Sequence, residues 1–455
     1  MSLERPSNST SRRLRSKVRV STLSQLGLAL ALAVGCVAAV QAQSLQELYD
    51  AAKGYDATYL SARALADSAQ YKVAQSKALL LPAAALVGGA SQVNSEGSAP
   101  NIHTTSTQIG LNASYALFNR SNSVTVEQSL KQLELAKAQW ATAEQDLIVR
   151  VAQAYFDVLA SQDALNTTRT SKAAITEQLA SAKRNFEVGT ATITDTREAQ
   201  ARFDLANAQE IGAENELRTK RIALDQLVGR TGIAPKPLLV PVTLPSIVPA
   251  DAEDWVSKAD AQHPGIVQSR IAYEVAKLEI DKAKAANLPT VGLTAAYTRS
   301  HGDSNYAPQN GNLNSLSLGV QASLPLFTGF STQNRIKEVL VLEDKARNDL
   351  EAVRRQVWQG TRQAYYGVQS LQAQVKALEA AESSSKLALE ATQLGYKVGV
   401  RVNLDVLNSQ TQLFQTQRDL AKARYDVLMG SLKLRQAAGQ LSAEDVTALN
   451  QLIAK

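Results

Sequence analysis

Histidine and cysteine are the side chains best suited to metal binding or nucleophilic catalysis, and both are rare in this sequence. The histidines are His103, His263 and His301. They stand far apart in loop-like or proline-flanked stretches, and no two have the i, i+4 spacing that places a pair of imidazoles on one helix face. No serine or aspartate constellation surrounds them. The sequence therefore does not support an enzyme, a metal site or a cofactor site, and we expect none of them.

The single cysteine, Cys36, lies in an apolar run at residues 26–40 that follows a basic segment at residues 12–19. The run is too short to span a membrane comfortably, and a small-residue cleavage site follows it, ending at Ala42. We therefore predict a secretory signal peptide at residues 1–42. Its removal would leave the mature chain without cysteine, and so without disulfides, thiolate metal sites or a cysteine nucleophile.

Cys36 has a second interpretation, as the lipid-modified first residue of a lipoprotein. The preceding residues 33–35 lack the leucine that is usual three positions upstream, and the apolar run continues past the cysteine. We therefore favour cleavage after Ala42.

The positive net charge of the chain comes mostly from the predicted signal peptide. The peptide holds six of the 48 Lys and Arg residues and one of the 42 Asp and Glu residues, which leaves 42 positive and 41 negative side chains in the mature chain. A nearly neutral chain lacks the basic surface that binds phosphate backbones. We expect no nucleic acid partner.

Two halves of the mature sequence repeat each other at an offset of 207 to 210 residues. The matching positions are Leu-Pro at 81–82 and 288–289, Gln-Ala-Tyr at 153–155 and 363–365, Val-Gly at 188–189 and 398–399, and Asp195 and Asp405. A unit this long is a duplicated folding module rather than a short solenoid repeat. We therefore predict structural repeats at residues 43–234 and 251–440. A proline-rich linker at residues 235–250 joins them, and a C-terminal periplasmic tail covers residues 441–455.

Each repeat contains two segments with the alternation of a β-strand. The segments lie at residues 82–94 and 108–118 in the first repeat and at residues 289–300 and 315–326 in the second. Gly-, Asn- and Ser-rich segments at residues 95–105 and 301–312 would form the hairpin loops. The alternation fits a transmembrane strand with one face toward lipid, and it fits a strand of a soluble sandwich as well. The signal peptide and the lack of an apolar run long enough for a membrane helix favour an outer-membrane barrel.

Each repeat also contains three helical patterns. The opening helices are expected at residues 44–80 and 251–287, the long helices at 124–187 and 332–397, and the returning helices at 192–228 and 403–438. Apolar or small residues recur at three-and-four spacing along the long patterns, which indicates a coiled-coil seam. The opening and returning helices are each about half as long as the long helix, so the two short helices stacked end to end would match it.

Four strands cannot close a barrel by themselves, since single-chain bacterial barrels begin at eight strands. An open sheet in lipid would leave backbone groups unsatisfied, at several kcal/mol each. If the strands are transmembrane, the chain must therefore assemble with copies of itself. Two copies would give eight strands and a filled interior, and three would give twelve strands and room for a lumen.

The sequence resembles the TolC family of outer-membrane channels over nearly the whole mature chain. The resemblance is carried by the duplication, by the Leu-Pro before each strand pair, by Leu-Pro-Leu-Phe at residues 324–327, and by Tyr-Lys-Val-Gly at 396–399 followed by Asp-Val-Leu at 405–407. It implies an α+β membrane protein in which a homotrimer forms a 12-stranded transmembrane β-barrel, four strands per chain, continued by a long periplasmic α-helical barrel of coiled-coil helices.

The resemblance also implies a function and partners. The trimer would lie in the outer-membrane lipid of a Gram-negative bacterium. It would dock on an inner-membrane ABC or RND transporter through a periplasmic adaptor protein, and serve as a duct for type I protein secretion or multidrug efflux. Both uses need the same duct, so the sequence leaves both cargoes open.

The resemblance further implies where the duct is gated. Gly189 and Gly399 would form the tips of the helix turns at the periplasmic mouth. Asp405 matches the first ring of acidic residues at the pore constriction, whereas the second ring position is Asn408 here, which puts a doubled acidic constriction in doubt. Three Asp405 carboxylates at a narrow axis would repel one another and attract cations.

The latch that holds such a mouth shut corresponds to Tyr396 and Arg401 on the second hairpin and to Thr194 and Asp195 on the first. Hydrogen bonds or ion pairs from Tyr396 and Arg401 would hold the inner hairpin inward. Asp195 has a second interpretation, because Thr192 and Asp195 have capping-box spacing and an acidic side chain stabilises the first turn of a helix.

A soluble periplasmic coiled-coil adaptor or structural protein without a pore is the alternative. It would account for the helices. It would leave the four alternating segments and the paired Leu-Pro breaks without a purpose.

Overall fold

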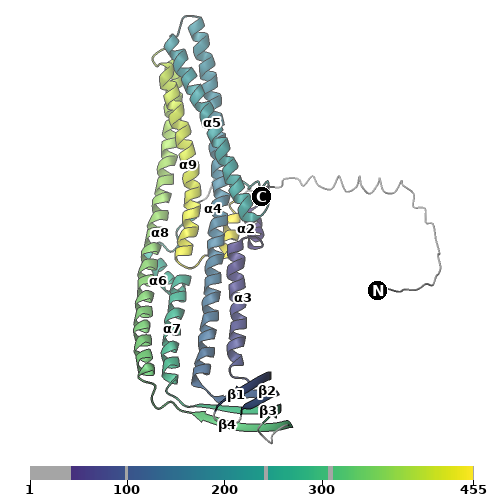
Figure 1. Ribbon diagram of the computed structural model, residues 1–455. Coiled ribbons are helices and arrows are strands. Elements are labelled where there is room, and N and C mark those ends of the chain that lie inside the picture. The colour runs from purple at the N-terminus through teal and green to yellow at the C-terminus, as the bar shows by residue number, and fades with distance from the viewer. Residues whose placement is uncertain (1–41, 98–100, 240–243, 306–310, 454–455) are drawn as a thin grey trace, which may run out of the picture. The chain divides into compact units, whose positions relative to one another are not determined.

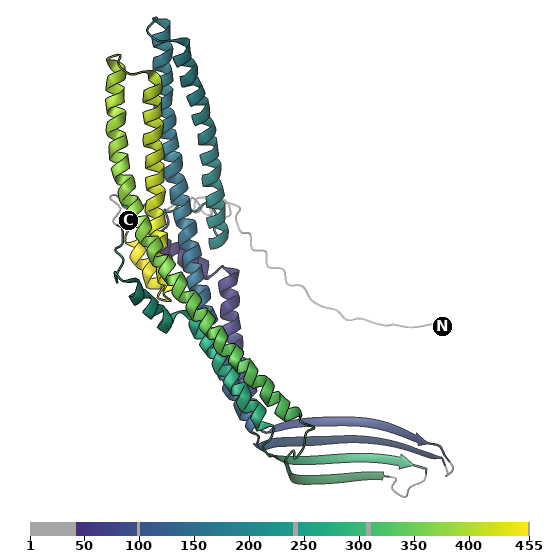
Figure 2. The ribbon, with the colours of Figure 1, turned by 90° about the vertical axis from the view of Figure 1, so that its left-hand side faces the viewer.

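The computed structural model describes residues 42–97, 101–239, 244–305 and 311–453, and residues 43–455 form one compact unit (Figure 1). The predicted signal peptide, apart from Ala42, therefore lies outside the described residues, as does Cys36. Within the unit, four strands lie at one end of a bundle of long helices (Figures 1 and 2). Across the described ranges, no helix combines the length and the apolar character needed to cross a membrane.

The four predicted strands are present and form one antiparallel sheet. In order across the sheet they are β1 (Ala83–Ser95), β2 (Ile102–Phe118), β3 (Thr290–Ser304) and β4 (Gly311–Ser323). The predicted loops at residues 95–105 and 301–312 are too long, because β2 already begins at Ile102 and β3 continues to Ser304. Residues 104–107 are threonines and serine, and they pair with β1 because β-branched side chains suit a strand even when they are polar.

The strand register gives the sheet one apolar face. A row of Cα partners that crosses all four strands consists of Leu86, Leu111, Tyr297 and Leu316. About half or more of each of these side chains is exposed in the single chain. The next row, on the opposite face, consists of Ala85, Asn112, Ala296 and Ser317. The predicted alternation is therefore confirmed, with large apolar side chains on one face and small or polar ones on the other.

The predicted long helices are confirmed and begin slightly earlier than expected. α4 (Arg120–Glu187) has 68 residues and α8 (Ser331–Lys397) has 67. α5 (Ile193–Val228) returns along α4, and α9 (Asn403–Ala437) returns along α8. Both hairpins turn at the end of the bundle that lies away from the strands (Figure 1).

The prediction of one opening helix per repeat is wrong, because each opening segment is broken. The first splits into α2 (Leu45–Lys53) and α3 (Ala57–Ala78), and the second into α6 (Ala252–Gln262) and α7 (Pro264–Ala285). α3 packs along α4, and α7 packs along both α4 and α8, on the half of the bundle nearer the strands (Figure 1). The returning helices cover the other half, so the predicted stacking of two short helices against each long one is confirmed.

The ends of the returning helices meet these breaks. Gly229 follows α5 with φ 72°, and Gly439 follows the end of α9 with φ 70°. A Cβ on Gly229 would lie 2.4 Å from the ring of Tyr55, and a Cβ on Gly439 would lie 2.5 Å from the Cα of His263. Only glycine fits so close an approach in a left-handed conformation. Asp56 and His263 then cap α3 and α7.

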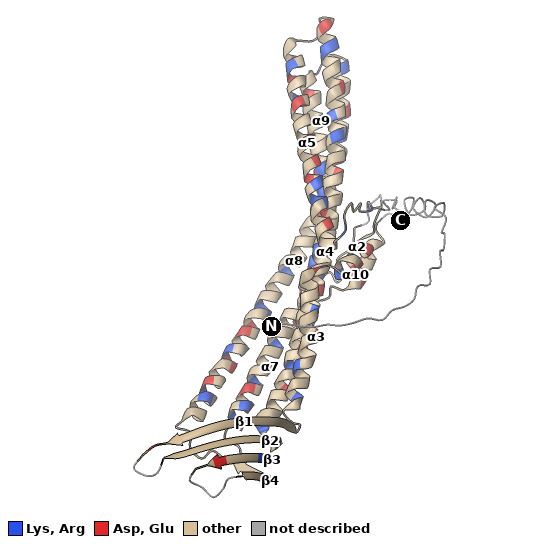
Figure 3. Cartoon of the chain, turned by 45° about the vertical axis from the view of Figure 1, so that its right-hand side comes forward, with Lys and Arg blue, Asp and Glu red and all other residues tan. Residues whose placement is uncertain are grey.

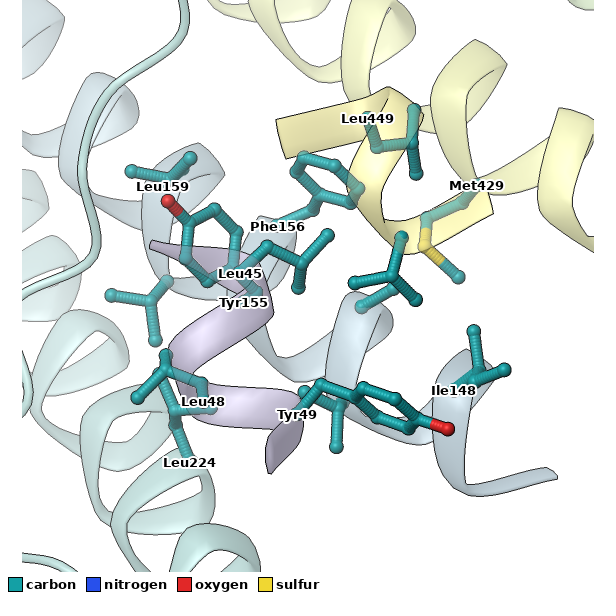
Figure 4. Close-up of a cluster of buried hydrophobic side chains, with 14 of the residues drawn as sticks. Leu45, Leu48, Tyr49, Ile148, Tyr155, Phe156, Leu159, Leu224, Met429 and Leu449 are labelled. Carbon is teal, nitrogen blue, oxygen red and sulfur yellow. The ribbon is translucent and has the colours of Figure 1, made fainter. Parts of the chain in front are cut away.

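The largest hydrophobic core lies where the broken helices meet the hairpins (Figure 4). It includes Leu48 from α2, Phe156 from α4, Leu224 from α5, Met429 from α9 and Leu449 from α10 (Ala443–Asn450). The C-terminal segment at residues 441–455, expected as a tail, thus supplies a helix to this core. Burial of several large apolar side chains here stabilises the middle of the bundle by the hydrophobic effect.

The repeated Gln-Ala-Tyr positions anchor the linker between the repeats. The Tyr155 hydroxyl donates a hydrogen bond to the carbonyl oxygen of Lys236 at 2.7 Å, and the Tyr365 hydroxyl donates one to the carbonyl oxygen of Ala250. The two equivalent tyrosines therefore hold opposite ends of the segment at residues 235–250. Within the described parts of that segment, no residue is helical.

Candidate functional site

Two helix turns lie side by side at the end of the bundle away from the strands (Figure 2). Gly189 and Gly399 occupy equivalent positions in them, with φ of 79° and 82°. The N–H of Thr190 donates to the carbonyl oxygen of Asn185 at 2.8 Å, and the N–H of Val400 donates to that of Gly395 at 2.9 Å. A left-handed glycine just past the last helical turn satisfies carbonyl groups that the helix leaves free. The two copies therefore fold into the same tight turn.

The first hairpin uses Asp195 to begin its returning helix. The Asp195 carboxylate accepts the N–H of Thr192 at 2.9 Å, and the N–H of Asp195 donates to the Thr192 hydroxyl at 3.2 Å. This is the capping box that the spacing of the two residues indicates. Thr194 is exposed on the same turn. In one chain, Asp195 therefore serves the helix start.

The second hairpin begins its returning helix without a side-chain cap. Asp405 lies in the first turn of α9, half-buried, and Arg401 lies just before it. The Arg401 Nη1 atom is 3.7 Å from Asp405 Oδ2, and more than half of the arginine side chain is exposed. An exposed ion pair of this length stabilises weakly, by about 0–1 kcal/mol. Most of the Asp405 charge therefore remains available to solvent or to ions.

Three hydrogen bonds join the two hairpins near the turns. The donors and acceptors are Asn185 Nδ2 to Tyr396 Oη at 3.1 Å, Arg202 Nη2 to Asn408 Oδ1 at 2.9 Å, and Gln178 Nε2 to Asn403 Oδ1. They connect α4 with α8, α5 with α9, and α4 with α9. We call these three contacts the hairpin tethers. The contact of Arg202 is exposed and that of Asn185 is partly buried, whereas Asn403 is a buried residue. A typical hydrogen bond of this kind contributes about 0.5–1.5 kcal/mol.

The structure brings together some of the predicted gate residues and leaves others apart. Tyr396 and Asn408 are both bound to the first hairpin, and Arg401 is next to Asp405. Among the described contacts within one chain, none joins Tyr396 or Arg401 to Thr194 or Asp195. The tether partners Gln178, Asn185 and Arg202 were not predicted. Each of their contacts spans more than 200 positions, so no local pattern points to them.

A small apolar cluster supports the tethers from inside the bundle. It consists of Ile175, Leu179, Ala182, Ala199, Ala206 and Leu407. Leu407, between Asp405 and Asn408, is fully buried against α4 and α5. Half of these residues are alanines, and the cluster is much smaller than the core in the middle of the bundle, so it buries less apolar area. The tip of the bundle is therefore held less strongly than its middle.

A buried polar contact marks the stronger attachment farther down the bundle. The Tyr425 hydroxyl donates a hydrogen bond to Asp163 Oδ2 at 2.6 Å, which joins α9 to α4. Burial raises the pKa of Asp163, and the hydrogen bond from Tyr425 opposes that rise. Burial and the neighbouring carboxylate also raise the pKa of Tyr425. A desolvated pair of this kind loses more when broken than an exposed tether does.

The histidines take structural positions rather than forming one site. Nδ1 of His103 lies 2.9 Å from Asn94 Oδ1, and Nδ1 of His301 lies 3.0 Å from Asn312 Oδ1. His263 is partly buried, and this burial lowers its pKa. No group of three or more His, Cys, Asp or Glu side chains among the described residues could hold a metal ion.

Charge is distributed unevenly between the helices and the strands. Figure 3 shows Lys, Arg, Asp and Glu along the whole helical bundle and very few on the sheet. β1, β2 and β4 contain none of these residues, and β3 contains only Arg299 and Asp303. Strands with one exposed apolar face and almost no charge are typical of a lipid-facing barrel.

Comparison with known proteins gives the family. The family model described as "Outer membrane efflux protein" matches residues 48–230 and 255–440. The chain is 35% identical over 428 residues to "Outer membrane protein TolC" of Vibrio cholerae serotype O1, covering 93% of this chain and 97% of that protein. It is 34% identical over 317 residues to "Alkaline protease secretion protein AprF" of Pseudomonas aeruginosa, covering 69% of this chain and 66% of that protein.

A solved structure with the same fold supports this assignment. The outer membrane protein VceC from Vibrio cholerae superposes with a TM-score of 0.75 at 21% identity, covering 87% of this chain and 96% of that chain. At this identity the likeness concerns the fold alone. The family match covers both repeats, from the opening helices to the end of α9. The chain belongs to the outer membrane efflux protein family and is an outer-membrane channel protein of the TolC family.

Proposed function

We propose that three copies of this chain form an exit duct across the outer membrane and the periplasm for type I protein secretion, multidrug efflux or both. The observation that carries this proposal is the open sheet. β1 and β4 are its edges, and both are exposed along their whole length in the single chain. In lipid, each unpaired backbone group costs several kcal/mol. Pairing β4 of one copy with β1 of the next would remove every edge.

The helices would continue the barrel as a tunnel into the periplasm. α4 follows β2 almost directly, α8 follows β4 after the short segment at residues 324–330, and both helices run to the turns at Gly189 and Gly399. Three chains would supply twelve strands and a ring of closely packed helices around one axis. The turns would then form the periplasmic mouth. We propose that this mouth docks with a periplasmic adaptor and an inner-membrane ABC or RND transporter, which would supply the cargo and the energy.

The names of the relatives support both kinds of cargo. The alkaline protease secretion protein AprF is named for secretion of a protein, and the matching family is named for efflux. TolC of Vibrio cholerae is similar over almost the whole of both chains. We propose that the duct carries both secreted proteins and small molecules.

We further propose that the mouth is gated at the hairpin tethers. Opening would move the second hairpin away from the first and break the contacts of Tyr396 and Asn408, while the buried pair of Asp163 and Tyr425 holds the base of the hairpins. The contacts of Tyr396 and Asn408 are partly buried and exposed, so they are weak enough to break on docking. Thr194 and Asp195 would complete the latch only through contacts between chains.

Asp405 would give the constriction its charge. Three copies of its carboxylate near the axis would favour cations over anions. Asn408 carries no charge, and its side chain is bound by Arg202. The proposed constriction therefore has one acidic ring rather than two, with Arg401 near it as a partial counter-charge.

The proposal is tested by deleting the gene and by cross-linking from the tip. Deletion should abolish secretion of a type I substrate or raise drug susceptibility, and the intact gene should restore the phenotype. A photo-reactive amino acid at Val400, 75% exposed at the turn, should cross-link a periplasmic adaptor in cells. The same group at Leu316, 72% exposed on the strands, is the matched control and should not. A deletion that changes neither secretion nor drug susceptibility would contradict the proposal.

A further inference from the structure

The apolar face of the sheet becomes polar toward the hairpin ends, over two neighbouring rows of residues. The row of Leu86, Leu111, Tyr297 and Leu316 is followed, toward the hairpin ends, by a row that consists of Gly88, Ile109, Arg299 and Asn314. The next row on the same face consists of Ala90, Thr107, His301 and Asn312. Apolar side chains therefore give way to polar ones in the row of Arg299 on β3 and β4, and one row later, at Thr107, on β2.

Arg299 marks this boundary. It is the only Lys or Arg in the four strands, it is exposed, and it lies on the apolar face, two residues beyond Tyr297. An arginine that faces lipid costs about 2–4 kcal/mol at the middle of a membrane and close to nothing at its edge. The position of Arg299 is therefore the edge of the lipid-facing band, on the side of the hairpin ends.

Arg299 has no carboxylate partner among the described residues of its own chain. Its neighbours in the row are Ile109 on β2 and Asn314 on β4. The only acidic residue of the strands, Asp303, lies 3.3 Å from His301 Nε2 instead. A neighbouring copy paired with β4 would present β1, which contains no acidic residue. The strands, paired in this way, thus offer this guanidinium no anion, so an anionic partner would have to come from outside the barrel.

We propose that Arg299 binds a phosphate group of an outer-leaflet glycolipid, with one such site on each chain of the trimer. The planar guanidinium can donate two parallel hydrogen bonds to one phosphate. Asn314 and Asn312 lie beside it and one row above it as further donors on the same face. The inference rests on the proposed periplasmic position of the helices, which places the hairpin ends at the outer leaflet.

The binding experiment uses the purified, delipidated trimer in detergent, titrated with lipid A that carries its phosphates. Three probes are compared: phosphorylated lipid A, the same lipid A after removal of its phosphates, and inorganic phosphate. Arg299→Gln removes the positive charge and the planar guanidinium. Arg299→Lys keeps the charge but cannot donate two parallel hydrogen bonds to one phosphate. The double variant Arg299→Gln/Ser300→Arg keeps the net charge but moves it to the opposite face, since Ser300 follows Arg299 in the strand.

Arg299→Gln should weaken binding of phosphorylated lipid A at least tenfold, an order-of-magnitude expectation for a charge-assisted pair, and should leave binding of the dephosphorylated lipid unchanged. Arg299→Lys should lie between the parent and Arg299→Gln, and the double variant should match Arg299→Gln. Equal binding by the parent and Arg299→Gln would overturn the inference. So would full binding by the double variant, or inorganic phosphate that binds at Arg299 as tightly as the lipid does.

Trimer formation and export are measured on the same variants. If Arg299→Gln does not form trimers, Arg299→Lys still tests the site. A trimer of Arg299→Lys should bind phosphorylated lipid A more weakly than the parent, because lysine keeps the charge but cannot donate the two parallel hydrogen bonds. Export by the deletion strain tests the proposed duct and does not test the lipid site. If the parent exports normally and Arg299→Gln binds lipid A as tightly as the parent does, the lipid site is refuted and the proposed duct is not.

Discussion

The side chains of Asn185 and Tyr396, which are 211 positions apart, meet at the end of the bundle farthest from the strands. Asn185 Nδ2 donates to Tyr396 Oη at 3.1 Å and joins α4 to α8 just before both helices turn. Each residue comes from a different copy of the duplicated module. The contact therefore joins the two copies at the place where the two hairpins would have to separate.

Tyr396→Phe removes one tether and keeps the aromatic ring. We expect it to cost about 0.5–1.5 kcal/mol in each chain and so to raise the mean conductance of the trimer in planar bilayers. Arg401→Ser should act in the same direction if Arg401 belongs to the latch. Tyr366→Phe is the control, because Tyr366 lies on the same helix and is 57% exposed. If Tyr396→Phe and Arg401→Ser both show the conductance of the parent and of Tyr366→Phe, the latch assignment is wrong.

Asp405→Ala should weaken the preference of the channel for cations. The carboxylate is half-buried in the first turn of α9, and its nearest positive group, Arg401 Nη1, is 3.7 Å away. Three such carboxylates attract cations at a narrow pore. The reversal potential in a salt gradient should therefore shift toward zero. Asp419→Ala, an exposed change of the same charge farther along α9, should leave it unchanged. A reversal potential that shifts in Asp419→Ala but not in Asp405→Ala would mean that Asp405 does not form the selectivity ring.

The junction of α6 and α7 should weaken in acid through His263. Burial lowers the pKa of His263 from its usual 6.5, and its neutral Nδ1 accepts the N–H of Gly265 at 3.1 Å. The unfolded chain therefore binds the proton first, so the stabilisation is complete above about pH 6.5 and is lost as the pH falls below it. His263→Asn keeps a capping side chain that does not titrate.

The denaturation midpoint of the trimer, measured between about pH 7.5 and pH 5, should fall less in His263→Asn than in the parent. His103→Asn replaces a histidine at an exposed position and should behave like the parent. If the parent and His263→Asn show the same pH dependence, protonation of His263 does not contribute to the loss of stability in acid.

Gly439→Ala should destabilise the fold. The added Cβ would lie 2.5 Å from the Cα and 2.8 Å from the N of His263, and the φ of 70° is strained for alanine. Since backbone atoms must move, we expect a loss of about 1–3 kcal/mol. Gly360→Ala, within α8, meets no atom within 4 Å in the single chain. That control should be neutral or stabilising by up to about 1 kcal/mol in urea denaturation.

The sequence predicted the parts of the fold that depend on local periodicity. Alternation predicted the four strands, and three-and-four spacing predicted α4 and α8. Gly189 and Gly399 indicated the turns. The breaks at Asp56 and His263 were missed because tertiary contacts with Gly229 and Gly439 position them. Two local signals were present, Gly54 at the end of α2 and Pro264 at the start of α7, since glycine often ends a helix and proline favours its first turn.

In the candidate site, too, local contacts could be predicted from the sequence and contacts between distant positions could not. The capping box of Thr192 and Asp195 is a local interaction, and its spacing in the sequence indicates it. The tethers of Asn185 and Arg202 join positions more than 200 residues apart, and a single sequence carries no signal for such pairs. Arg299 was likewise found only through the strand register, which shows that it shares a face with Tyr297 and not with Thr298.

The most direct test of the gate is a reversible lock on the tether itself. Asn185→Cys and Tyr396→Cys would place two thiols where the side chains now meet, and a reducible bifunctional maleimide can join them. Export and channel conductance should stop when the pair is cross-linked and recover after reduction, with the parent chain unaffected by the same treatment. Complete cross-linking that leaves export unchanged would contradict a gate that opens by separating these two hairpins.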